Sequence, residues 1–422
     1  MIMRHICYDT NMNKFLEKIS IEIVLLILLS ILIASYTFML PFVKDMYIPH
    51  TLLRELSQSF IHGKLFLANP SLGIGDIALF ENKFYLFYGP FPSLFLAPLV
   101  FLIPSINQHF VLLPFFIGAF YCFLKIFFRV TNSWKKSLYL VFGFFFGTSV
   151  WFLASINITA YVVQLMAIFL LIISLYFYIN KKSLLLSGLI FSFMVATRLM
   201  LILTLVFFVV DILRSNTSHR KKLLNILIFT TPLLVVLTGL GFYNFARFHN
   251  LLDSGYNYNI SDNRNIMFVS AKAHGFFSLS HIPGNIYYGF LKPLDPIFEN
   301  VYSHVLKFPY FKADPSGFSI FLSSPFLLYI FYKVKRGRYF IPSIAAIFVV
   351  MISVLMYFSS GTWTYGYRYA LDYFPFLFII LAYVFKYHFS LTVRLLIIFS
   401  IIFNAFFMYS MWGVYPLLPN PI

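Results

Sequence analysis

Two aspartates and two arginines lie just after, between or inside the apolar runs of the sequence. Asp45 comes just after the first apolar run, and Asp76 lies in the polar stretch that follows it. Arg198 interrupts the long apolar run 183–213, and Arg368 lies in a short loop between two late apolar runs. A carboxylate can take a proton from a hydroxyl or position a metal ion, and an arginine fork can hold a phosphate. These residue types suit the transfer of a group from a phosphate-bearing donor to a hydroxyl acceptor.

Both carboxylates also have a structural interpretation. Asp45 can pair with Lys44 or cap the helix that follows it. Asp76 follows a glycine in GIGDIALF, and an aspartate in such a loop is often a turn former. His50 and His62 could assist, because histidine titrates near neutral pH. Single histidines on an interfacial helix are usually not catalytic, so the carboxylates are the stronger candidates.

The two arginines are open to two interpretations as well. Arg368 and its neighbour Tyr367 lie among tryptophan and tyrosine residues of the kind that mark a membrane interface. Arg368 can bind a donor phosphate, contact lipid headgroups or pair with Asp372, and Tyr367 is a candidate for substrate contact. Arg198 stands inside an apolar run, where an ionisable group is costly. If 183–213 is a helical hairpin, Arg198 lies at its outer tip and can face a donor phosphate; otherwise it is half of a structural pair.

The composition places these residues in a membrane protein. The chain has 422 residues, of which 60% are hydrophobic and 11% charged, with a mean hydropathy of +0.85. A soluble domain has about 25% charged residues, so a soluble enzyme is excluded. The net charge is +17, but the basic residues lie beside apolar runs and therefore indicate topology rather than nucleic-acid binding. Cys7 and Cys122 are too few for a disulfide framework or a Cys/His metal site.

Apolar runs that can cross a bilayer recur along the chain. Because the run 183–213 has room for two short helices that meet near Arg198, we expect an all-α polytopic protein with about 11 or 12 membrane helices. Residues 1–18 are expected in the cytoplasm, and the first run suits a signal anchor rather than a cleaved signal peptide. The predicted runs are 19–41, 86–104, 109–129, 137–156, 158–179, 183–213, 223–246, 317–332, 339–358, 373–388 and 391–412.

The charges predict which segments share a side of the membrane. Polar stretches 42–85 and 247–316, with the loop 359–372, hold ten of the 14 acidic residues: Asp45, Glu55, Asp76, Glu81, Asp253, Asp262, Asp295, Glu299, Asp314 and Asp372. Short basic loops that are nearly free of acids are expected in the cytoplasm. They contain Lys125, Arg129, Lys135 and Lys136; Lys181 and Lys182; Arg214, Arg220, Lys221 and Lys222; and Lys333, Lys335, Arg336 and Arg338. The chain thus divides into a membrane core 19–246, an outer loop 247–316 and C-terminal membrane helices 317–422.

One segment conflicts with this topology. If 19–41 and 109–129 both cross the membrane, 86–104 cannot cross as well unless the basic cluster 125–136 lies outside. The segment contains Pro90, Pro92, Pro98 and Pro104, which fit a re-entrant or broken helix. The sequence leaves both arrangements open.

The stretch TLLRELSQSFIHGKLF predicts an amphipathic helix. Leu52, Leu56 and Phe60 recur every four residues, polar side chains fill the other face, and Gly63 can stop the helix. Such a helix can lie flat on the membrane surface. An ordinary helix packed on a small outer domain gives the same periodicity.

Several longer stretches resemble, in their order, those of a known enzyme group. They are KDMYIPHTLLRELSQSFIHGKLFL, GDIALFENKFYLFYGPFPSLFLAPLV, GLIFSFMVATRLMLIL, YNFARFHNLLDSGYNYNI and GYRYALDYFPFLFI. They resemble the first outer loop, the short-helix pair with a Thr-Arg turn, the start of the large outer loop and the loop before a late span in bacterial GT-C membrane glycosyltransferases. This superfamily includes the group related to protein O-mannosyltransferases and aminoarabinose transferases. No P-loop, Gly-rich dinucleotide turn, His-Glu-x-x-His or Gly-x-Ser-x-Gly is present.

The resemblance implies a GT-C-like architecture and a glycosyltransferase in the bacterial inner or plasma membrane. Such an enzyme transfers a sugar from a polyprenyl-phosphate-linked donor to an acceptor at the outer face. The implied acids are Asp45 and Asp76, and the implied donor-binding residues are Arg198 and Arg368. Related enzymes commonly carry Asp-Glu after the first span, whereas Met46 follows Asp45 here. That difference leaves a divalent metal ion, the only cofactor considered, open, and the acceptor is unknown.

The alternative is a polytopic transporter or flippase of a lipid-linked or polar substrate, because many spans and an intramembrane arginine suit a polar pathway. A transporter predicts internal repeats with broken helices in corresponding halves. The two outer loops of this chain differ in length and content, and its acids gather on one side. We therefore rank the glycosyltransferase first, the transporter second and a non-catalytic scaffold third.

Overall fold

The computed structural model describes Ser30, residues 51–68, 70, 76–260, 271, 273–314, 316–332 and 335–361, and residues 366–414 with side chains as far as Met408. Asp45, His50 and, apart from Ser30, the predicted run 19–41 lie outside the described residues.

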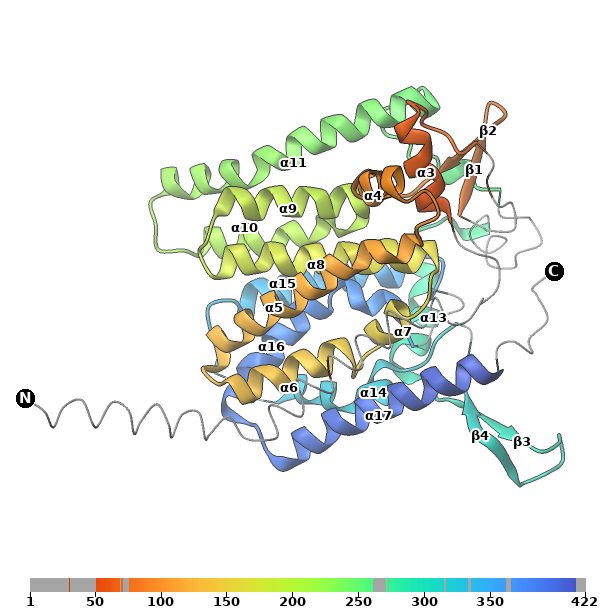
Figure 1. Ribbon diagram of the computed structural model, residues 1–422. Helices are drawn as coiled ribbons and strands as arrows, with labels where there is room; N and C mark the ends of the chain where they lie inside the picture. Colours follow the sequence, from red (N-terminus) through yellow and green to blue (C-terminus); the bar gives the residue numbers. More distant parts are fainter. Residues whose placement is uncertain are drawn as a thin grey trace, which may run out of the picture.

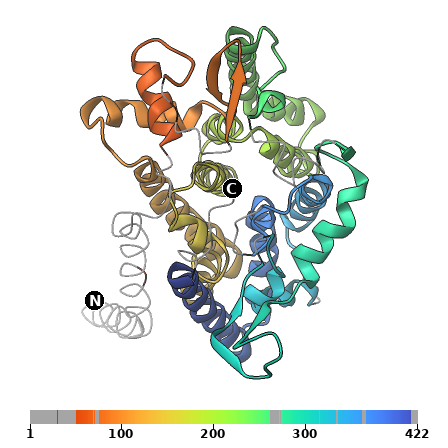
Figure 2. The ribbon, with the colours of Figure 1, turned by 90° about the vertical axis from the view of Figure 1, so that its right-hand side faces the viewer.

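The described chain is a helix bundle whose long helices run side by side (Figure 1). In the end-on view, α8 lies in the middle with other helices around it (Figure 2). Its residues are apolar on nearly every side. In its most apolar stretch of 18 residues, 78% are buried inside the bundle, as expected of a helix that is hydrophobic all round. The bundle helices are α5 (Leu112–Thr131), α6 (Trp134–Phe145), α8 (Thr159–Ile179), α9 (Leu184–Thr197), α10 (Leu205–Leu213), α11 (His219–Phe248), α15 (Phe340–Met356), α16 (Phe374–Tyr387) and α17 (Leu391–Val414).

Four described helices are long and apolar enough to cross a membrane. They are Gln108–Thr131, Thr159–Ile179, His219–Phe248 and Leu391–Met408. Five more apolar helices are shorter: Phe91–Leu102, Leu184–Thr197, Leu199–Leu213, Phe340–Met356 and Phe374–Tyr387. The predicted all-α class with membrane-spanning helices therefore agrees with the structure. Among the described residues, however, fewer helices reach span length than the predicted 11 or 12.

Breaks within apolar runs explain much of this difference. The run 137–156 divides into α6 and the short helix α7 (Val150–Ala154). The run 317–332 divides into α14 (Ile320–Ser323) and the 3-10 helix η6 (Pro325–Phe331). At the second break the Ser324 hydroxyl donates a hydrogen bond to the carbonyl of Gly147 at 2.6 Å. Hydropathy responds only to side-chain polarity, so it does not register a break held by backbone contacts.

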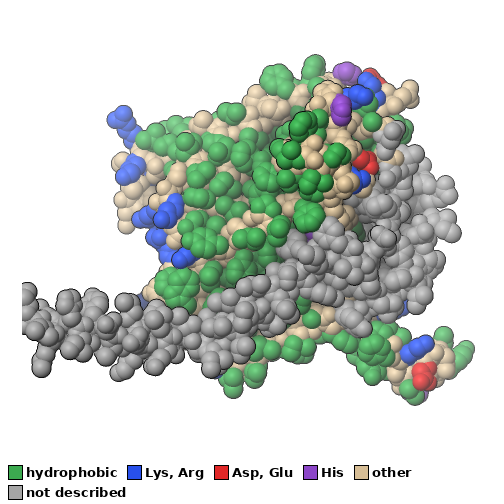
Figure 3. Space-filling view, viewed as in Figure 1, with side chains coloured by type: hydrophobic (Ala, Val, Ile, Leu, Met, Phe, Trp, Pro, Cys, Tyr) green, Lys and Arg blue, Asp and Glu red, His purple; other side chains and the backbone are tan. Residues whose placement is uncertain are grey.

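Basic and acidic segments lie at opposite ends of the bundle. Lys and Arg side chains gather where α5 meets α6, α8 meets α9 and α10 meets α11 (Figure 3). We call this the basic end; it carries Lys181, Lys182, Arg214, Arg220, Lys221 and Lys222. The opposite end, which we call the hairpin end, carries the strands β1 to β4 (Figure 1). This separation follows the predicted segregation of charge, and the side of the membrane that each end faces stays a prediction.

Helix α4 (Phe91–Leu102) resolves the conflict over segment 86–104. Its 12 residues include Pro98 within the helix and extend about 18 Å, which is short of the roughly 30 Å core of a bilayer. It lies at the hairpin end beside α3, so α5 starts there and ends at the basic end (Figure 1). The broken-segment interpretation is therefore the one that the structure follows, and the cluster 125–136 joins the other basic loops.

The predicted amphipathic helix is α3 (Leu52–Ile61), and Gly63 follows it with a φ of 67°. Its apolar face, with Leu52, Leu53 and Leu56, is fully buried. The Ser57 hydroxyl donates to the carbonyl of Ser93 in α4 at 2.8 Å. The apolar face is covered by protein, which matches the packed-helix interpretation rather than a helix lying flat on lipid.

Two antiparallel hairpins complete the hairpin end. Strands β1 (Ile77–Phe80) and β2 (Lys83–Leu86) are joined by a two-residue turn, Glu81 and Asn82, with φ values of 47° and 58°. Strands β3 (Asp295–Phe298) and β4 (Leu306–Lys312) form a longer hairpin that projects beside the end of α17 (Figures 1 and 2).

The last turn of α11 is tied to β2 by a buried arginine. Nη1 of Arg247 donates to the carbonyl of Leu86 at 2.9 Å, and its guanidinium lies 3.8 Å from the ring centroid of Tyr243. Both residues belong to YNFARF, one of the stretches that resemble the glycosyltransferases. In the structure this arginine positions strand β2 against the end of α11.

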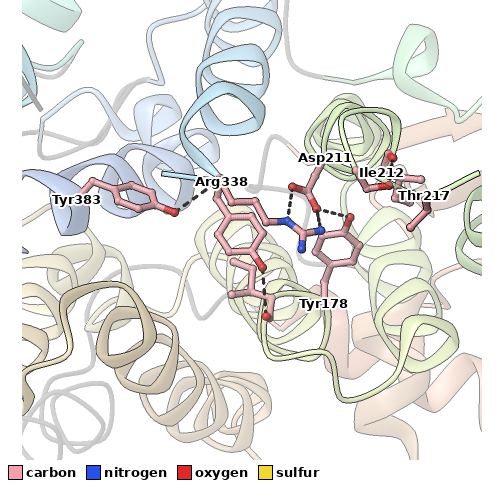
Figure 4. Close-up of polar contacts among 9 residues, drawn as sticks. Tyr178, Asp211, Ile212, Thr217, Arg338 and Tyr383 are labelled. Atoms are coloured by element: carbon pink, nitrogen blue, oxygen red, sulfur yellow. Dashed lines mark hydrogen bonds and ion pairs between the residues drawn. The ribbon is translucent and has the colours of Figure 1, made fainter. Parts of the chain in front are cut away.

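At the basic end a buried carboxylate joins three segments (Figure 4). Asp211 of α10 is 2% exposed and accepts hydrogen bonds from Nε of Arg338 at 2.9 Å and Nη2 at 2.6 Å. The Tyr178 hydroxyl of α8 donates to the same carboxylate at 2.8 Å. Arg338 is therefore more than a topology signal, because its fork holds the segment before α15 against α8 and α10.

Candidate functional site

Asp372 lies at the centre of a set of polar side chains inside the apolar bundle, formed with Gln164, Arg198 and Arg368, and we call this set the polar group. Its side chain is fully buried in the 3-10 helix η7 (Arg368–Asp372), directly before α16. Oδ2 accepts a hydrogen bond from Nη2 of Arg198 at 2.8 Å, and Oδ1 accepts one from Nε2 of Gln164 at 3.0 Å. A buried carboxylate is tolerated only with such partners. It thereby joins α8, the end of α9 and η7.

Arg198 stands at the tip of a helical hairpin, as one of the two interpretations predicts. Helix α9 ends at Thr197, Arg198 is extended with φ −145° and ψ 98°, and η2 (Leu199–Thr204) starts the return into α10. The side chain of Arg198 is 15% exposed. Its pair with Asp372 also fulfils the second interpretation, so the hairpin tip and the structural pair occur together. Nε of Arg198 has no hydrogen-bond partner among the described residues.

Arg368 is buried among neutral groups. Nη1 donates to Oε1 of Gln164 at 3.0 Å, and Nη2 donates to the Tyr369 hydroxyl at 3.1 Å. The guanidinium lies 4.5 Å from the ring centroid of Tyr369 and 5.3 Å from that of Tyr161. The predicted pair between Arg368 and Asp372 is not formed, because Gln164 lies between them. Within the described part of the chain no carboxylate forms an ion pair with Arg368, and its direct contacts are with neutral polar groups and aromatic faces.

A glycine makes room for this arginine. Gly361 has a φ of 92°, and a Cβ on it would lie 2.8 Å from both Cγ and Nε of Arg368. Any larger residue would displace the guanidinium. Nε of Arg368 is buried and makes no hydrogen bond within the described residues.

Asp76 brings a second carboxylate to the same region. Oδ1 accepts a hydrogen bond from the Tyr88 hydroxyl at 3.0 Å. Burial raises the pKa of Asp76, while the bond from Tyr88 and the positive charge of Arg368 lower it in part. Gly89 allows the loop that contains Tyr88 to pack closely on the tip of the α9–α10 helical hairpin, because a Cβ on Gly89 would lie 2.0 Å from the carbonyl oxygen of Ala196.

Four tyrosines surround these charged groups, and we call them the tyrosine cluster: Tyr88, Tyr256, Tyr357 and Tyr369. The hydroxyls of Tyr256 and Tyr357 are hydrogen-bonded to each other. The ring centroids of Tyr357 and Tyr369 lie 5.4 Å apart. Burial raises the pKa of Tyr88, and Asp76, Tyr256 and Tyr369 each influence its ionisation. The cluster therefore connects the loop between β2 and α4, the 3-10 helix η3 (Tyr256–Tyr258), the end of α15 and η7.

The other predicted site residues are placed elsewhere or not described. Asp45 and His50 lie outside the described residues. His62 is exposed at the end of α3, with Nδ1 2.8 Å from the carbonyl oxygen of Gln58. Tyr367 is 1% exposed, packs on Gly289 and directs its hydroxyl toward a backbone carbonyl in α15. The predicted roles of these residues stay predictions.

A search for metal-binding groups gives no candidate within the part of the chain that is described. There, no three His, Cys, Asp or Glu side chains lie close enough together to hold an ion. The described residues therefore offer no set of ligands for the divalent metal ion that the sequence left open.

Comparison with known proteins gives no relative. No protein-family model, curated protein or solved structure matches this chain.

The charge of the group indicates what it can bind. Arg198 is paired with Asp372, whereas Arg368 retains a positive charge that no carboxylate among the described residues contacts. A desolvated guanidinium of this kind suits a phosphate, which can accept several of its hydrogen bonds at once. Asp76, with its raised pKa, supplies a carboxylate that can take up a proton.

Sequence reasoning missed two parts of this site. Gln164 is a fully buried amide in the second turn of α8, and its signal was an amide side chain inside an apolar run. The tyrosine cluster gave no signal, because the chain has 29 tyrosines and their number alone does not single out any of them.

Proposed function

We propose that the chain is a membrane glycosyltransferase with a GT-C-like architecture of about 11 or 12 membrane helices. It transfers a sugar from a polyprenyl-phosphate-linked donor to an acceptor at the hairpin end, in a bacterial inner or plasma membrane. The observation that carries the proposal is that Arg198 and Arg368 are joined through Asp372 and Gln164. Asp76 is bonded to Tyr88, and the next residue, Gly89, packs against the end of α9 directly before Arg198.

The arginines have the role of holding the donor phosphate. Arg368 fits it best, because its guanidinium is buried and is bonded only to the neutral groups of Gln164 and Tyr369. A donor phosphate provides the anionic partner that Arg368 lacks among the described residues. Arg198 contributes less directly, since one of its nitrogens is already engaged by Asp372.

The reaction requires one proton transfer and one exchange of bonds. A carboxylate takes the proton of the acceptor hydroxyl, and the acceptor oxygen forms a new bond to the anomeric carbon of the sugar. The bond between that carbon and the phosphate oxygen breaks, and the lipid phosphate leaves with the electron pair. Arg368 stabilises the negative charge that develops on the phosphate. Asp45 and Asp76 are the two candidates for the carboxylate.

The tyrosine cluster suits the sugar. Aromatic faces provide apolar contact for a sugar ring, and tyrosine hydroxyls can donate to its oxygens. Tyr88 is already bonded to Asp76, so a ligand beside this tyrosine also lies beside the candidate base.

A transporter or flippase is the second candidate function. The breaks at Arg198 and at Pro325 favour it, because discontinuous helices are common in transporters. Transporter sites lie near the middle of the membrane, however, whereas Arg198 follows the end of α9 at the hairpin end (Figure 1). The position of the polar group therefore favours the glycosyltransferase.

The test is a transfer assay in proteoliposomes with radiolabelled polyprenyl-phosphate hexoses and pentoses, using cell-envelope fractions as the acceptor. We expect sugar to leave the lipid fraction with the wild type, and Asp76→Asn or Asp45→Asn to slow this by about 100- to 10,000-fold. Glu299→Gln is the matched control, since Glu299 is an exposed carboxylate on the β3–β4 hairpin, which has no assigned role in the transfer. Movement of intact donor across the bilayer without sugar transfer would instead establish the transporter.

A further inference from the structure

The hairpin of β3 and β4 presents apolar side chains away from the bundle. At its turn Val301 and Tyr302 are each 93% exposed, and on its strands Phe308 is 61% and Phe298 is 42% exposed. Hydrophobic side chains also cover the base of the hairpin where it projects at the lower right of Figure 3. A group of exposed apolar residues of this size marks an interaction surface.

The hairpin continues the apolar surface of a membrane-spanning helix. The ring of Phe308 lies 6.2 Å from the ring of Phe406 in α17. Phe406 lies in the second half of α17, which also exposes Ile402 and Phe399. The hairpin therefore lies beside the half of α17 that leads to the hairpin end (Figure 1).

The turn of the hairpin pairs several of its own backbone N–H groups. The N–H of Tyr302 donates to Oδ1 of Asn300 at 3.0 Å, and the N–H of Ser303 donates to the carbonyl of Asn300 at 3.1 Å. The N–H of Val305 donates to Oγ of Ser303 at 3.0 Å, and that of Glu299 donates to the carbonyl of Val305 at 3.1 Å. Backbone groups without partners are costly in lipid. This turn has paired four of the N–H groups that would oppose its entry.

The other hairpin at the same end differs in each respect. Its turn is Glu81 and Asn82, both polar, and its strands are held against the body of the protein by contacts such as that of Phe80 with Phe248 and Tyr258. The comparison separates a hairpin that is packed on protein from one that is not.

We propose that the β3–β4 turn inserts Val301 and Tyr302 into the boundary between headgroups and acyl chains of the adjacent membrane leaflet. The occupant of the apolar surface is phospholipid. Tyrosine favours this depth because its ring is apolar and its hydroxyl can reach the headgroups. The exposed Lys307 on β4 can keep its ammonium at the phosphates while its stem lies along the lipid. This interfacial anchor is independent of the proposed sugar transfer.

Environment-sensitive labels test the anchor. In the full chain with Cys7→Ser and Cys122→Ala, Tyr302→Cys is labelled with an NBD fluorophore and the protein is reconstituted in phosphatidylcholine vesicles. Asn82→Cys, on the turn of β1 and β2, is the matched control. We expect the label at 302 to emit at shorter wavelength, to be quenched by nitroxide-bearing acyl chains and to be shielded from iodide supplied on both sides. The label at 82 is expected to emit at longer wavelength, to escape quenching by the nitroxide-bearing acyl chains and to be quenched by iodide.

A label at 302 that behaves like the label at 82 overturns the anchor. The measurement is repeated at several protein-to-lipid ratios, because contact with a second copy of the chain would also shield the label. Shielding that disappears on dilution with lipid assigns the surface to protein and overturns the proposal, whereas shielding that persists supports it. Val301→Cys provides a second label position at the same turn if Tyr302→Cys does not accumulate.

Discussion

Arg198 and Asp372 are 174 residues apart in the sequence, and Nη2 of the first lies 2.8 Å from Oδ2 of the second. The pair closes the polar group from two sides, since Arg198 comes from the tip of the α9–α10 hairpin and Asp372 from the segment before α16. Because Asp372 is engaged with Arg198 and Gln164, it does not neutralise Arg368. Arg198 is therefore engaged in a structural ion pair, whereas Arg368 keeps a charge that can bind an anion.

Asp372→Asn is expected to destabilise the protein strongly. The change removes the negative charge that compensates Arg198, and breaking a buried pair in this way costs about 3 to 5 kcal/mol, with the lower value favoured here because Arg198 is partly exposed. Thermal unfolding in detergent measures the loss as a lower midpoint. Adding Arg198→Gln should restore part of the stability, since the uncompensated charge is then gone. A variant with Asp372→Asn alone that unfolds at the wild-type temperature would contradict this role.

Asp76→Asn is expected to change stability in a pH-dependent way. Burial raises the pKa of Asp76 above 3.8, so the folded state favours the protonated carboxyl. That contribution is fully present below the unfolded-state value and is lost as pH rises through the folded-state value. Asparagine has no ionised form, so the variant should be more stable than the wild type at neutral pH and similar to it below about pH 3.8. Thermal unfolding midpoints of the variant and the wild type, measured from neutral pH to below 3.8, check the direction of this difference, with Glu299→Gln at an exposed position as control.

Asp211→Asn tests the buried carboxylate at the basic end. It weakens two charge-assisted hydrogen bonds from Arg338, whose side chain is 48% exposed, so we expect a loss of about 1.5 to 3 kcal/mol. Arg336→Gln, two residues from Arg338 and without an ion pair among the described residues, should leave the unfolding midpoint unchanged. Donor binding should survive in both variants, and equal midpoints for both would remove the structural role of Asp211.

The sequence predicted those features that depend on a single residue in its local context. Arg198 predicted a break in the run 183–213 because an arginine is costly in lipid, and α9 ends directly before it. Gly63 predicted the end of α3 through the left-handed backbone that glycine allows. Features that depend on distant partners were not predictable: the approach of Arg198 to Asp372 and the place of Gln164 between Asp372 and Arg368. For α3 the sequence left two interpretations open, and only the structure shows that its apolar face is covered by protein.

The number of membrane-spanning helices shows the same limit. Hydropathy counted 317–332 as one span, although Pro325 and the contact of Ser324 with Gly147 divide it. The loop 359–372 was predicted to combine interface aromatics with a phosphate-binding arginine. In the structure Arg368 is buried, because Gly361 permits its guanidinium to lie against the backbone.

Cysteine labelling tests the sidedness of the two ends. On the cysteine-free background described for the hairpin, Lys221→Cys at the basic end is expected to resist an impermeant maleimide in intact cells. Asn82→Cys at the hairpin end is expected to react with the same reagent, because short basic loops remain in the cytoplasm. Permeabilised cells, in which both positions should react, provide the control. Reaction at 221 and protection at 82 would place the proposed site on the cytoplasmic side.

The proposed donor site predicts that lysine cannot replace either arginine. In Arg368→Lys the fork that contacts Gln164 and Tyr369 is lost, and lysine cannot offer a phosphate two parallel hydrogen bonds. We expect binding of an undecaprenyl-phosphate analogue to weaken by about 1.5 to 3 kcal/mol, or roughly ten- to a hundredfold in Kd. Arg198→Lys should also weaken binding, together with a lower unfolding midpoint because the contact with Asp372 changes.

Arg336→Lys is the matched control, because Arg336 belongs to a basic segment away from the proposed site and, among the described residues, its guanidinium lies over the ring of Phe340. Its donor affinity should equal that of the wild type. The comparison separates binding from folding, since a loss of affinity in Arg368→Lys at an unchanged unfolding midpoint cannot arise from a damaged bundle. Equal affinities in all three variants would remove both arginines from the donor site, and the search for the phosphate-binding group would then move to the segment that contains Asp45.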